Sequence, residues 1–167
     1  QFCPPYPSCI SVYTGQQDIS NCWDCEEDGV VELWGKCYSI EYTTRLDLSN
    51  SGLTGSIPME IGDLINLERL YLHENQLTGG IPSEIGNLIN LSKLNLSDNQ
   101  LSGLIPNEIC SLDVTWYTTS FTDFTPTSSV YNNQLCPPYP SCLNGNYYVN
   151  GLGPYTIVGN QNTSNCD

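Results

Sequence analysis

The sequence predicts a short α/β repeat fold, in which similar coils stack into a solenoid with a disulfide-stabilised cap at each end. Three observations predict it. A 24-residue segment occurs three times in succession, at 46–69, 70–93 and 94–117. Each copy opens with a Leu-x-Leu alternation, which is typical of a short strand with one buried face. Cysteines stand before the first copy and after the last, where an open solenoid would expose its core leucines and strand edges.

The first half of each copy is expected to form a strand and a bend. The first two copies share 14 of 24 residues, and self-similarity at this period is typical of solenoids. Asn75 and Asn99 stand at the bend, where a buried amide side chain can satisfy backbone groups, whereas Ser51 predicts a looser first bend. The inward leucines are Leu46, Leu48 and Leu53 in the first copy, Leu70, Leu72 and Leu77 in the second, and Leu94, Leu96 and Leu101 in the third.

The second half of each copy is expected to return on the opposite side of the coil. It reads Gly-x-Ile-Pro, starting at Gly55, Gly79 and Gly103, and continues through Glu-Ile into a short helical turn. One unit is too small to bury its own leucines, so the coils must stack to bury them together.

This pattern resembles the plant-type leucine-rich repeat, whose 24-residue unit carries a Leu-x-Gly-x-Ile-Pro signature. The match covers about 46–112 and implies a right-handed solenoid. The run from Trp34 to Cys37 resembles the cysteine-bearing N-terminal cap of this family. Such repeats occur outside plants as well, so the resemblance does not fix the organism.

The chain divides into five expected segments. A partial fourth coil is expected because residues 131–135 align with 97–101, ten residues later than the period requires. The segments are an N-terminal linking segment at 1–22, an N-terminal cap at 23–45, three coils at 46–117, an insertion and partial fourth coil at 118–135, and a C-terminal cap or linking segment at 136–167.

The two ends of the chain share a second duplication. Cys3-Pro-Pro-Tyr-Pro-Ser-Cys9 recurs unchanged from Cys136 to Cys142, and Ser20-Asn21-Cys22 recurs as Ser164-Asn165-Cys166. One period, 3–135, holds six cysteines, and the second copy adds three, which makes nine. If Cys142 bonds Cys110, one cysteine still lacks a partner, and spacing alone does not give the other pairings.

The duplicated ends favour a non-enzymatic extracellular structural protein that assembles head-to-tail with itself, as a filament or a tandem array. The alternatives are a fragment of a longer tandem protein, or a duplicated capping motif with a free thiol. The candidate junction residues are Cys3, Cys9, Cys22, Cys136, Cys142, Cys166, Tyr6 and Tyr139.

The alternative function is an extracellular recognition module that binds a peptide, protein or glycan on the concave strand face. The resemblance implies this role, because the family includes the ectodomains of plant receptor kinases. The competing interpretation is a solvated sheet face with offsetting charges. Three strands at about 4.8 Å spacing give a face only about 15 Å tall, which is small for a tight interface. The candidate face residues are Arg45, Arg69, Lys93, Tyr71, His73 and Asp98.

Asn-x-Ser/Thr sequons make Asn90, Asn95 and Asn162 candidate N-glycosylation sites. Asn95 matters most, because a glycan there would stand in the middle of the strand face and would block protein binding. The chain could therefore be a glycoprotein, with glycans also among its possible partners.

Composition narrows the remaining classes. The chain has 18 acidic and 4 basic residues and a net charge of −14, which disfavours nucleic acid as a partner. No apolar run reaches the roughly 18 residues that span a bilayer, so no membrane insertion is expected. Nine cysteines indicate an oxidising compartment, hence an extracellular or cell-surface location. No nucleophile motif, phosphate loop or paired metal-ligand spacing is present, so neither enzymatic activity nor a cofactor or metal is expected.

Overall fold

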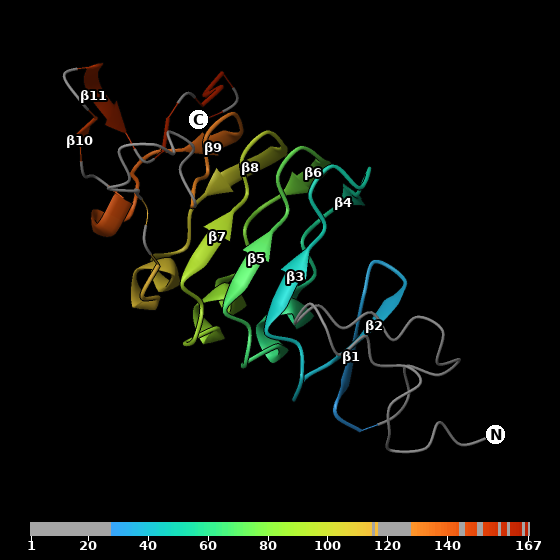
Figure 1. Cartoon of the computed structure of the whole chain (residues 1–167). Coiled ribbons are helices and arrows are strands. Elements are labelled where there is room, and N and C mark those ends of the chain that lie inside the picture. Colours follow the sequence, from blue (N-terminus) through green and yellow to red (C-terminus); the bar gives the residue numbers. More distant parts are fainter. Residues whose placement is uncertain are drawn as a thin grey trace.

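A computed structural model describes residues 28–114, 116, 128–143, 146–149, 152–156, 158–159, 161–164 and 166. The repeats form a solenoid-like stack with strands on one side and short helices on the other (Figure 1). The expected linking segment at 1–22 lies outside the described residues, as do Tyr6 and most of the expected insertion.

Two parallel sheets run through the stack, and each 24-residue unit contributes one strand to each sheet. In the first sheet β3 (Arg45–Asp47), β5 (Arg69–Tyr71) and β7 (Lys93–Asn95) pair in register, so that Leu46, Leu70 and Leu94 lie side by side. The second sheet holds β4 (Thr54–Gly55), β6 (Gln76–Gly79), β8 (Gln100–Leu104) and β9 (Gln134–Cys136).

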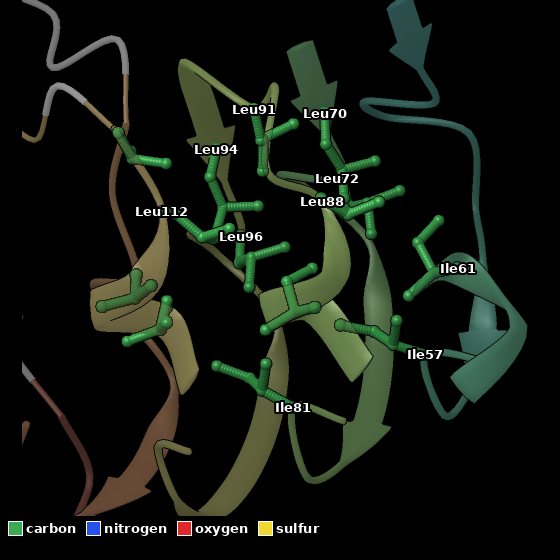
Figure 2. Packing of buried hydrophobic residues seen from close by; sticks show 14 of the residues in the cluster. Ile57, Ile61, Leu70, Leu72, Ile81, Leu88, Leu91, Leu94, Leu96 and Leu112 are labelled. Carbon is green, nitrogen blue, oxygen red and sulfur yellow. The ribbon is translucent and has the colours of Figure 1, made fainter. Parts of the chain in front are cut away.

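The leucines of the repeat form a continuous core between the strands and the helical side. Those of the first sheet, Leu46, Leu70 and Leu94, have no exposed surface. Figure 2 shows the strand leucines facing Ile57, Ile81 and Leu88 from the return half of the coils. Leu53 is only partly buried, while Leu77 and Leu101 are fully buried. This difference fits the looser first bend expected from Ser51.

A ladder of amide side chains supports the bends. The Asn99 Nδ2 donates to the carbonyls of Leu72, Leu96 and Ser97, and its Oδ1 accepts from the Leu77 N–H at 3.0 Å. Asn75 and Asn133 make corresponding bonds in their own coils. Each amide therefore links a coil to the one before it, through backbone groups that would otherwise be buried without partners.

The helical side consists of stacked 3₁₀ helices, η1 (Met59–Asp63), η2 (Ser83–Asn87) and η3 (Asn107–Ser111). Glycine lets them approach closely. A Cβ at Gly62 would lie 2.6 Å from the Glu84 carbonyl oxygen, and a Cβ at Gly86 would lie 2.6 Å from the Glu108 Cβ. The same position in the third unit is Cys110.

The N-terminal side of the stack is covered by a β-hairpin. Strands β1 (Val30–Leu33) and β2 (Lys36–Ser39) are antiparallel and are joined by Trp34 and Gly35, which have φ values of 49° and 75°. Two consecutive left-handed residues are typical of a tight hairpin turn. Val31, Leu33 and Tyr38 are buried in the same core as the repeat leucines.

The C-terminal side is covered by a longer segment with two disulfides. Strand β9 pairs with β8, and η4 (Ser141–Leu143) follows it. Strands β10 (Asn146–Val149) and β11 (Leu152–Thr156) form an antiparallel hairpin. Cys110 bonds Cys142, which confirms the pairing considered from the sequence, and Cys136 bonds Cys166.

Gln161 ends the amide ladder. Its Oε1 accepts from the Leu135 N–H, and its Nε2 donates to the carbonyls of Val130 and Val158. The Val158 side chain is buried, and so is the side chain of Val130 in the preceding coil. The C-terminal segment thus adds one more level to the amide ladder, in which glutamine makes the hydrogen bonds that asparagine makes in the repeats.

Candidate functional site

The candidate site is the outer face of the sheet β3–β5–β7, here called the strand face. Alternation along each strand turns the leucines into the core and their neighbours outward. The in-register pairing brings these neighbours into columns, as the sequence predicted. The columns are Arg45, Arg69 and Lys93; then Asp47, Tyr71 and Asn95; then Ser49, His73 and Ser97; then Asn50, Glu74 and Asp98.

Four of these side chains form a connected group at the N-terminal edge of the strand face. The Arg45 Nη2 donates to Asp47 at 2.8 Å, and the Arg45 guanidinium lies 5.6 Å from the Tyr71 ring centre. The Tyr71 and His73 rings meet edge to face at 6.2 Å. The His73 Nδ1 is covered and has no partner among the described residues, so a ligand would meet Nε2 instead.

Asp47 remains a carboxylate because its contacts favour the charged form. Burial raises the pKa of Asp47, but hydrogen bonds from Ser49 and Arg45 outweigh burial, and the pKa lies below its ordinary value of 3.8. The Ser49 hydroxyl donates at 2.7 Å. The carboxylate is thus already occupied by protein donors, and it offsets the charge of Arg45.

The column of Arg45, Arg69 and Lys93 therefore presents less unpaired positive charge than the sequence suggested. Within the described ranges, Arg69 and Lys93 make no ion pair, whereas Arg45 is paired. Arg69 is exposed and Lys93 half-buried. Since Arg45 and Asp47 stand two residues apart on one strand face, their pairing follows from strand alternation and was missed in the sequence analysis.

At the C-terminal edge the strand face is polar and includes a residue that sequence reasoning missed. The Asn95 Oδ1 accepts from the Ser97 N–H, the Ser97 hydroxyl and the Ser129 hydroxyl, the last two at 2.8 Å. Ser129 forms a parallel bridge with Asn95 and thereby extends the sheet. The shared Asn-Gln-Leu pattern, at 99–101 and 133–135, pointed to this coil, but Ser129 itself had no repeat signal.

The column behind the strand face lies in the left-handed backbone region. Asn50, Glu74, Asp98 and Asn132 have φ values of 49°, 57°, 55° and 52°. Asparagine and aspartate tolerate this region, whereas glutamate is uncommon there. The Asp98 Oδ1 accepts from the Asn132 Nδ2 at 2.7 Å. Asp98 is thus engaged with its neighbour at the edge of the face.

The three sequon asparagines occupy different surroundings. Asn95 lies on the strand face, and its Nδ2 donates no hydrogen bond within the described part of the chain. Asn90 is exposed, and its Nδ2 donates to the Ile65 carbonyl at 2.9 Å. Asn162 is exposed in the C-terminal segment.

Some of the candidate junction residues lie outside the described residues. Cys3, Cys9 and Cys22 fall in residues 1–27. The C-terminal counterparts Cys136, Cys142 and Cys166 are all in disulfides within the chain, and the Tyr139 hydroxyl donates to the Leu135 carbonyl. The C-terminal copy of the motif therefore has no thiol left for a bond to another subunit.

The described ranges show no sign of a metal site or a membrane span. They contain no cluster of three or more metal-ligating side chains and no helix long and apolar enough to cross a membrane. The glutamates Glu60, Glu84 and Glu108 follow one another along the 3₁₀ helices, away from the strand face.

Comparisons with known families match the repeat region. Residues 65–107 match the family described as "Leucine Rich repeats (2 copies)", and residues 42–64 match "Leucine Rich Repeat". A comparison with curated protein sequences gave no significant match.

Solved structures with similar folds include plant ectodomains. The Arabidopsis receptor kinase HAESA, in complex with the peptide hormone IDA and the co-receptor SERK1, is 36% identical over 62% of this chain, with a TM-score of 0.52, but this chain covers 16% of the matched chain. A chain of the BIR3–SERK2 complex from Arabidopsis thaliana is 28% identical, with coverage of 86% and 76% and a TM-score of 0.54. The Arabidopsis thaliana BIR2 ectodomain, 24% identical with coverage of 83% and 76% and a TM-score of 0.56, is similar in fold.

Proposed function

We propose that this chain, which is a leucine-rich-repeat protein, is a non-enzymatic extracellular recognition module that binds a protein partner through its strand face. The single observation that carries this proposal is the strand face itself. It presents Arg69, Tyr71 and His73 side by side on a rigid parallel sheet. Tyrosine and arginine, together with tryptophan, are enriched among the residues that contribute most to binding at protein interfaces.

The disulfides support an extracellular location. Cys110–Cys142 and Cys136–Cys166 lie in the part of the chain that closes the stack, and such bonds persist in oxidising compartments. A solved HAESA structure that is 36% identical to this chain is a leucine-rich-repeat ectodomain, which agrees with this location.

The size of the strand face favours a folded protein partner over a long peptide. The chain covers only 16% of the HAESA chain, which is titled as a complex with a peptide hormone, so most of that receptor has no counterpart here. The chain covers 76% of a matched chain in the BIR3–SERK2 complex, a contact between two proteins. A face about 15 Å tall suits part of a protein–protein interface.

The charges of the face indicate the chemistry of the partner. Arg69 and Lys93 make no ion pair among the described residues, and Arg45 is offset by Asp47. A partner surface with one or two carboxylates beside an aromatic or aliphatic anchor would complement this pattern. The net charge of −14 disfavours a strongly acidic partner.

A library of small protein domains displayed on phage, panned against the purified chain, tests the proposal. Selected binders are then measured by calorimetry against the native chain and three variants. Tyr71→Ala and Arg69→Glu should each weaken binding at least tenfold. Glu84→Lys, on the 3₁₀ side, is the control and should leave the affinity within threefold. Binders that ignore both face variants, or a failure to select any binder, would refute the proposal.

Head-to-tail assembly remains a second candidate function, supported by the two identical Cys-Pro-Pro-Tyr-Pro-Ser-Cys segments. Because the C-terminal cysteines are bonded internally, a filament would have to form by non-covalent docking or through N-terminal cysteines alone. Sedimentation velocity at rising concentration tests this. A single monomer boundary up to about 100 μM, with no dimer on non-reducing electrophoresis, would rule out the filament.

The segment boundaries and the glycans belong to the same proposal. We infer an N-terminal cap at 23–45, three coils at 46–117, a fourth partial coil ending at 135, and a C-terminal cap at 136–167. Intact-glycopeptide mass spectrometry of the secreted protein tests occupancy at Asn90, Asn95 and Asn162. The recognition function expects Asn95 to be unmodified, because full occupancy there would cover the strand face.

A further inference from the structure

We propose that the exposed turns between the 3₁₀ helices and the strand face form a second docking surface, which binds a basic amphipathic helix of another protein. This surface, here called the turn ridge, consists of Ile65 and Ile89 with the carboxylates of Glu41, Asp63, Glu68 and Asp113 around them. The inference goes beyond the recognition function proposed for the strand face, because none of these side chains belongs to that face.

The two isoleucines are exposed because of the turn on which they stand. Each isoleucine N–H donates to the carbonyl two residues earlier, at 2.8 Å for Ile65 and 2.9 Å for Ile89. The residues in between, Leu64 and Leu88, have φ and ψ values of −76° and 58°, and of −78° and 60°, which are typical of an inverse γ-turn. This turn buries both leucines completely, whereas Ile65 is 49% exposed and Ile89 is 71% exposed.

Ile65 and Ile89 lie on neighbouring coils whose turns are bonded to one another. The Asn90 Nδ2 donates to the Ile65 carbonyl at 2.9 Å, and the Asn66 Nδ2 donates to the Glu41 carbonyl at 3.1 Å. One step along the stack is about 4.8 Å, so the two isoleucines form one apolar surface. A single exposed apolar side chain is common on any protein, whereas adjoining ones rimmed by polar groups mark interaction sites.

The charges around the isoleucines are all negative and unpaired. The four carboxylates of the turn ridge are exposed, and none makes an ion pair or hydrogen bond within the described part of the chain. Residues 24 positions apart follow one another along the stack, so Glu41 precedes Ile65 and Asp113 follows Ile89 in one column. The two end carboxylates are thus about 15 Å apart. This surface complements an apolar partner with a basic residue on either side.

An α-helix laid along the stack matches these spacings. Side chains at helix positions i and i+4 lie about 5–6 Å apart on one face, close to the coil spacing of Ile65 and Ile89. Positions i−3 and i+7 lie on the same face, and the helix rises about 15 Å between them, as far as Glu41 lies from Asp113. A helix with leucines at i and i+4 and lysines at i−3 and i+7 therefore fits the turn ridge.

Methyl NMR with a synthetic peptide tests the proposal. The chain is made without glycans and with ¹³C-labelled isoleucine δ1 methyl groups. The probe is an acetylated and amidated 14-residue peptide of alanine and glutamine, with leucine at its positions 5 and 9 and lysine at its positions 2 and 12. We expect titration to shift the methyl signals of Ile65 and Ile89 and to leave those of the buried Ile61 and Ile85 in place. A control peptide with its leucines at positions 7 and 11, on the opposite helix face, should bind at least tenfold more weakly.

Variants of the turn ridge separate its apolar and charged parts. The double variant Ile65→Ser, Ile89→Ser should weaken binding of the peptide at least tenfold, because it removes the apolar contact. The double variant Glu41→Gln, Asp113→Asn should weaken binding at least threefold at low salt, and this difference should shrink as salt screens the exposed charges. Circular dichroism checks that each variant is folded.

Two further variants are controls outside the turn ridge. Leu104→Ser removes an exposed leucine of β8, and Tyr71→Ala alters the strand face, so each should leave the peptide affinity within twofold. The proposal would be overturned by the absence of methyl shifts up to about 1 mM peptide, by shifts at other isoleucines only, or by equal binding of the control peptide. Shifts of Ile65 and Ile89 with protein concentration alone would identify a second copy of the chain as the occupant and would overturn it as well.

Discussion

Replacement of Gly62 by alanine tests the close stacking of the 3₁₀ helices directly. The new Cβ would lie 2.6 Å from the Glu84 carbonyl oxygen and 2.7 Å from the Glu84 Cβ. Carbon atoms pack best at about 3.5–4.0 Å, so the next helix must move by about 1 Å. The atoms in the way include backbone that is itself packed into the stack, so rotamer changes cannot relieve the overlap. Overpacking of this kind costs about 1–3 kcal/mol, and we expect the upper part of that range.

The assay is thermal unfolding followed by circular dichroism under non-reducing conditions. A loss of about 2–3 kcal/mol should lower Tm by about 4–12 °C in a chain of this length. Gly80→Ala is the matched control, because its Cβ would meet only the Ser102 carbonyl oxygen, at 3.8 Å. We expect Gly80→Ala to change stability by no more than about 0.5 kcal/mol. Equal melting temperatures for the native chain and Gly62→Ala would refute the close-stacking argument.

Three further predictions concern single residues of the repeats. Asn99→Ala should destabilise the chain by about 3 kcal/mol in urea titration, because it removes four buried hydrogen bonds and leaves their backbone partners unsatisfied. The control Asn90→Ala removes one exposed hydrogen bond and should cost under about 1 kcal/mol. Equal losses in the two variants would contradict the ladder. Glu74→Asn should stabilise the chain by about 0.5–1 kcal/mol, since it relieves part of the roughly 1–2 kcal/mol cost of a left-handed residue. The control Glu68→Asn should give no such gain. A loss of stability in Glu74→Asn would contradict backbone strain at this position. Because the folded-state pKa of Asp47 is lowered, its ionic contribution is complete above pH 3.8 and disappears as the pH falls through the lowered value. The stability difference between the native chain and Asp47→Asn should therefore be larger at pH 7 than at pH 2.5, and a difference that grows in acid would contradict the pairing.

The repeating part of the fold was predictable because its signals are periodic. The Leu-x-Leu pairs placed Leu46, Leu70 and Leu94 in register, and the bend asparagines indicated buried amide hydrogen bonds. A strand of three residues gives only a weak sequence pattern on its own. The same pattern repeated three times at a fixed spacing predicts the strands strongly. The columns of the strand face follow from the same register.

The ends and the charge pairing were less predictable, because they depend on contacts that occur once. Gln161 replaces the ladder asparagine without any repeat pattern around it, and Ser129 joins the sheet after a long insertion. The sequence showed three cations in a column, but the pairing of Arg45 with Asp47 reduced that column to two. The duplicated ends favoured head-to-tail assembly, but spacing alone did not show that all three C-terminal cysteines bond within the chain.

The two crossed disulfides have a mechanical consequence. Under tension, the load path runs from Cys110 through its bond to Cys142, back along the backbone to Cys136, and through the second bond to Cys166. Only six peptide units and two bridges carry the force, a path of about 30 Å, where the intervening chain would otherwise extend to about 190 Å. The C-terminal third therefore cannot extend beyond this short path, even when its hairpin and coil unfold. A pulled molecule would yield first in the repeats before Cys110, and its last coil would stay tied to its cap.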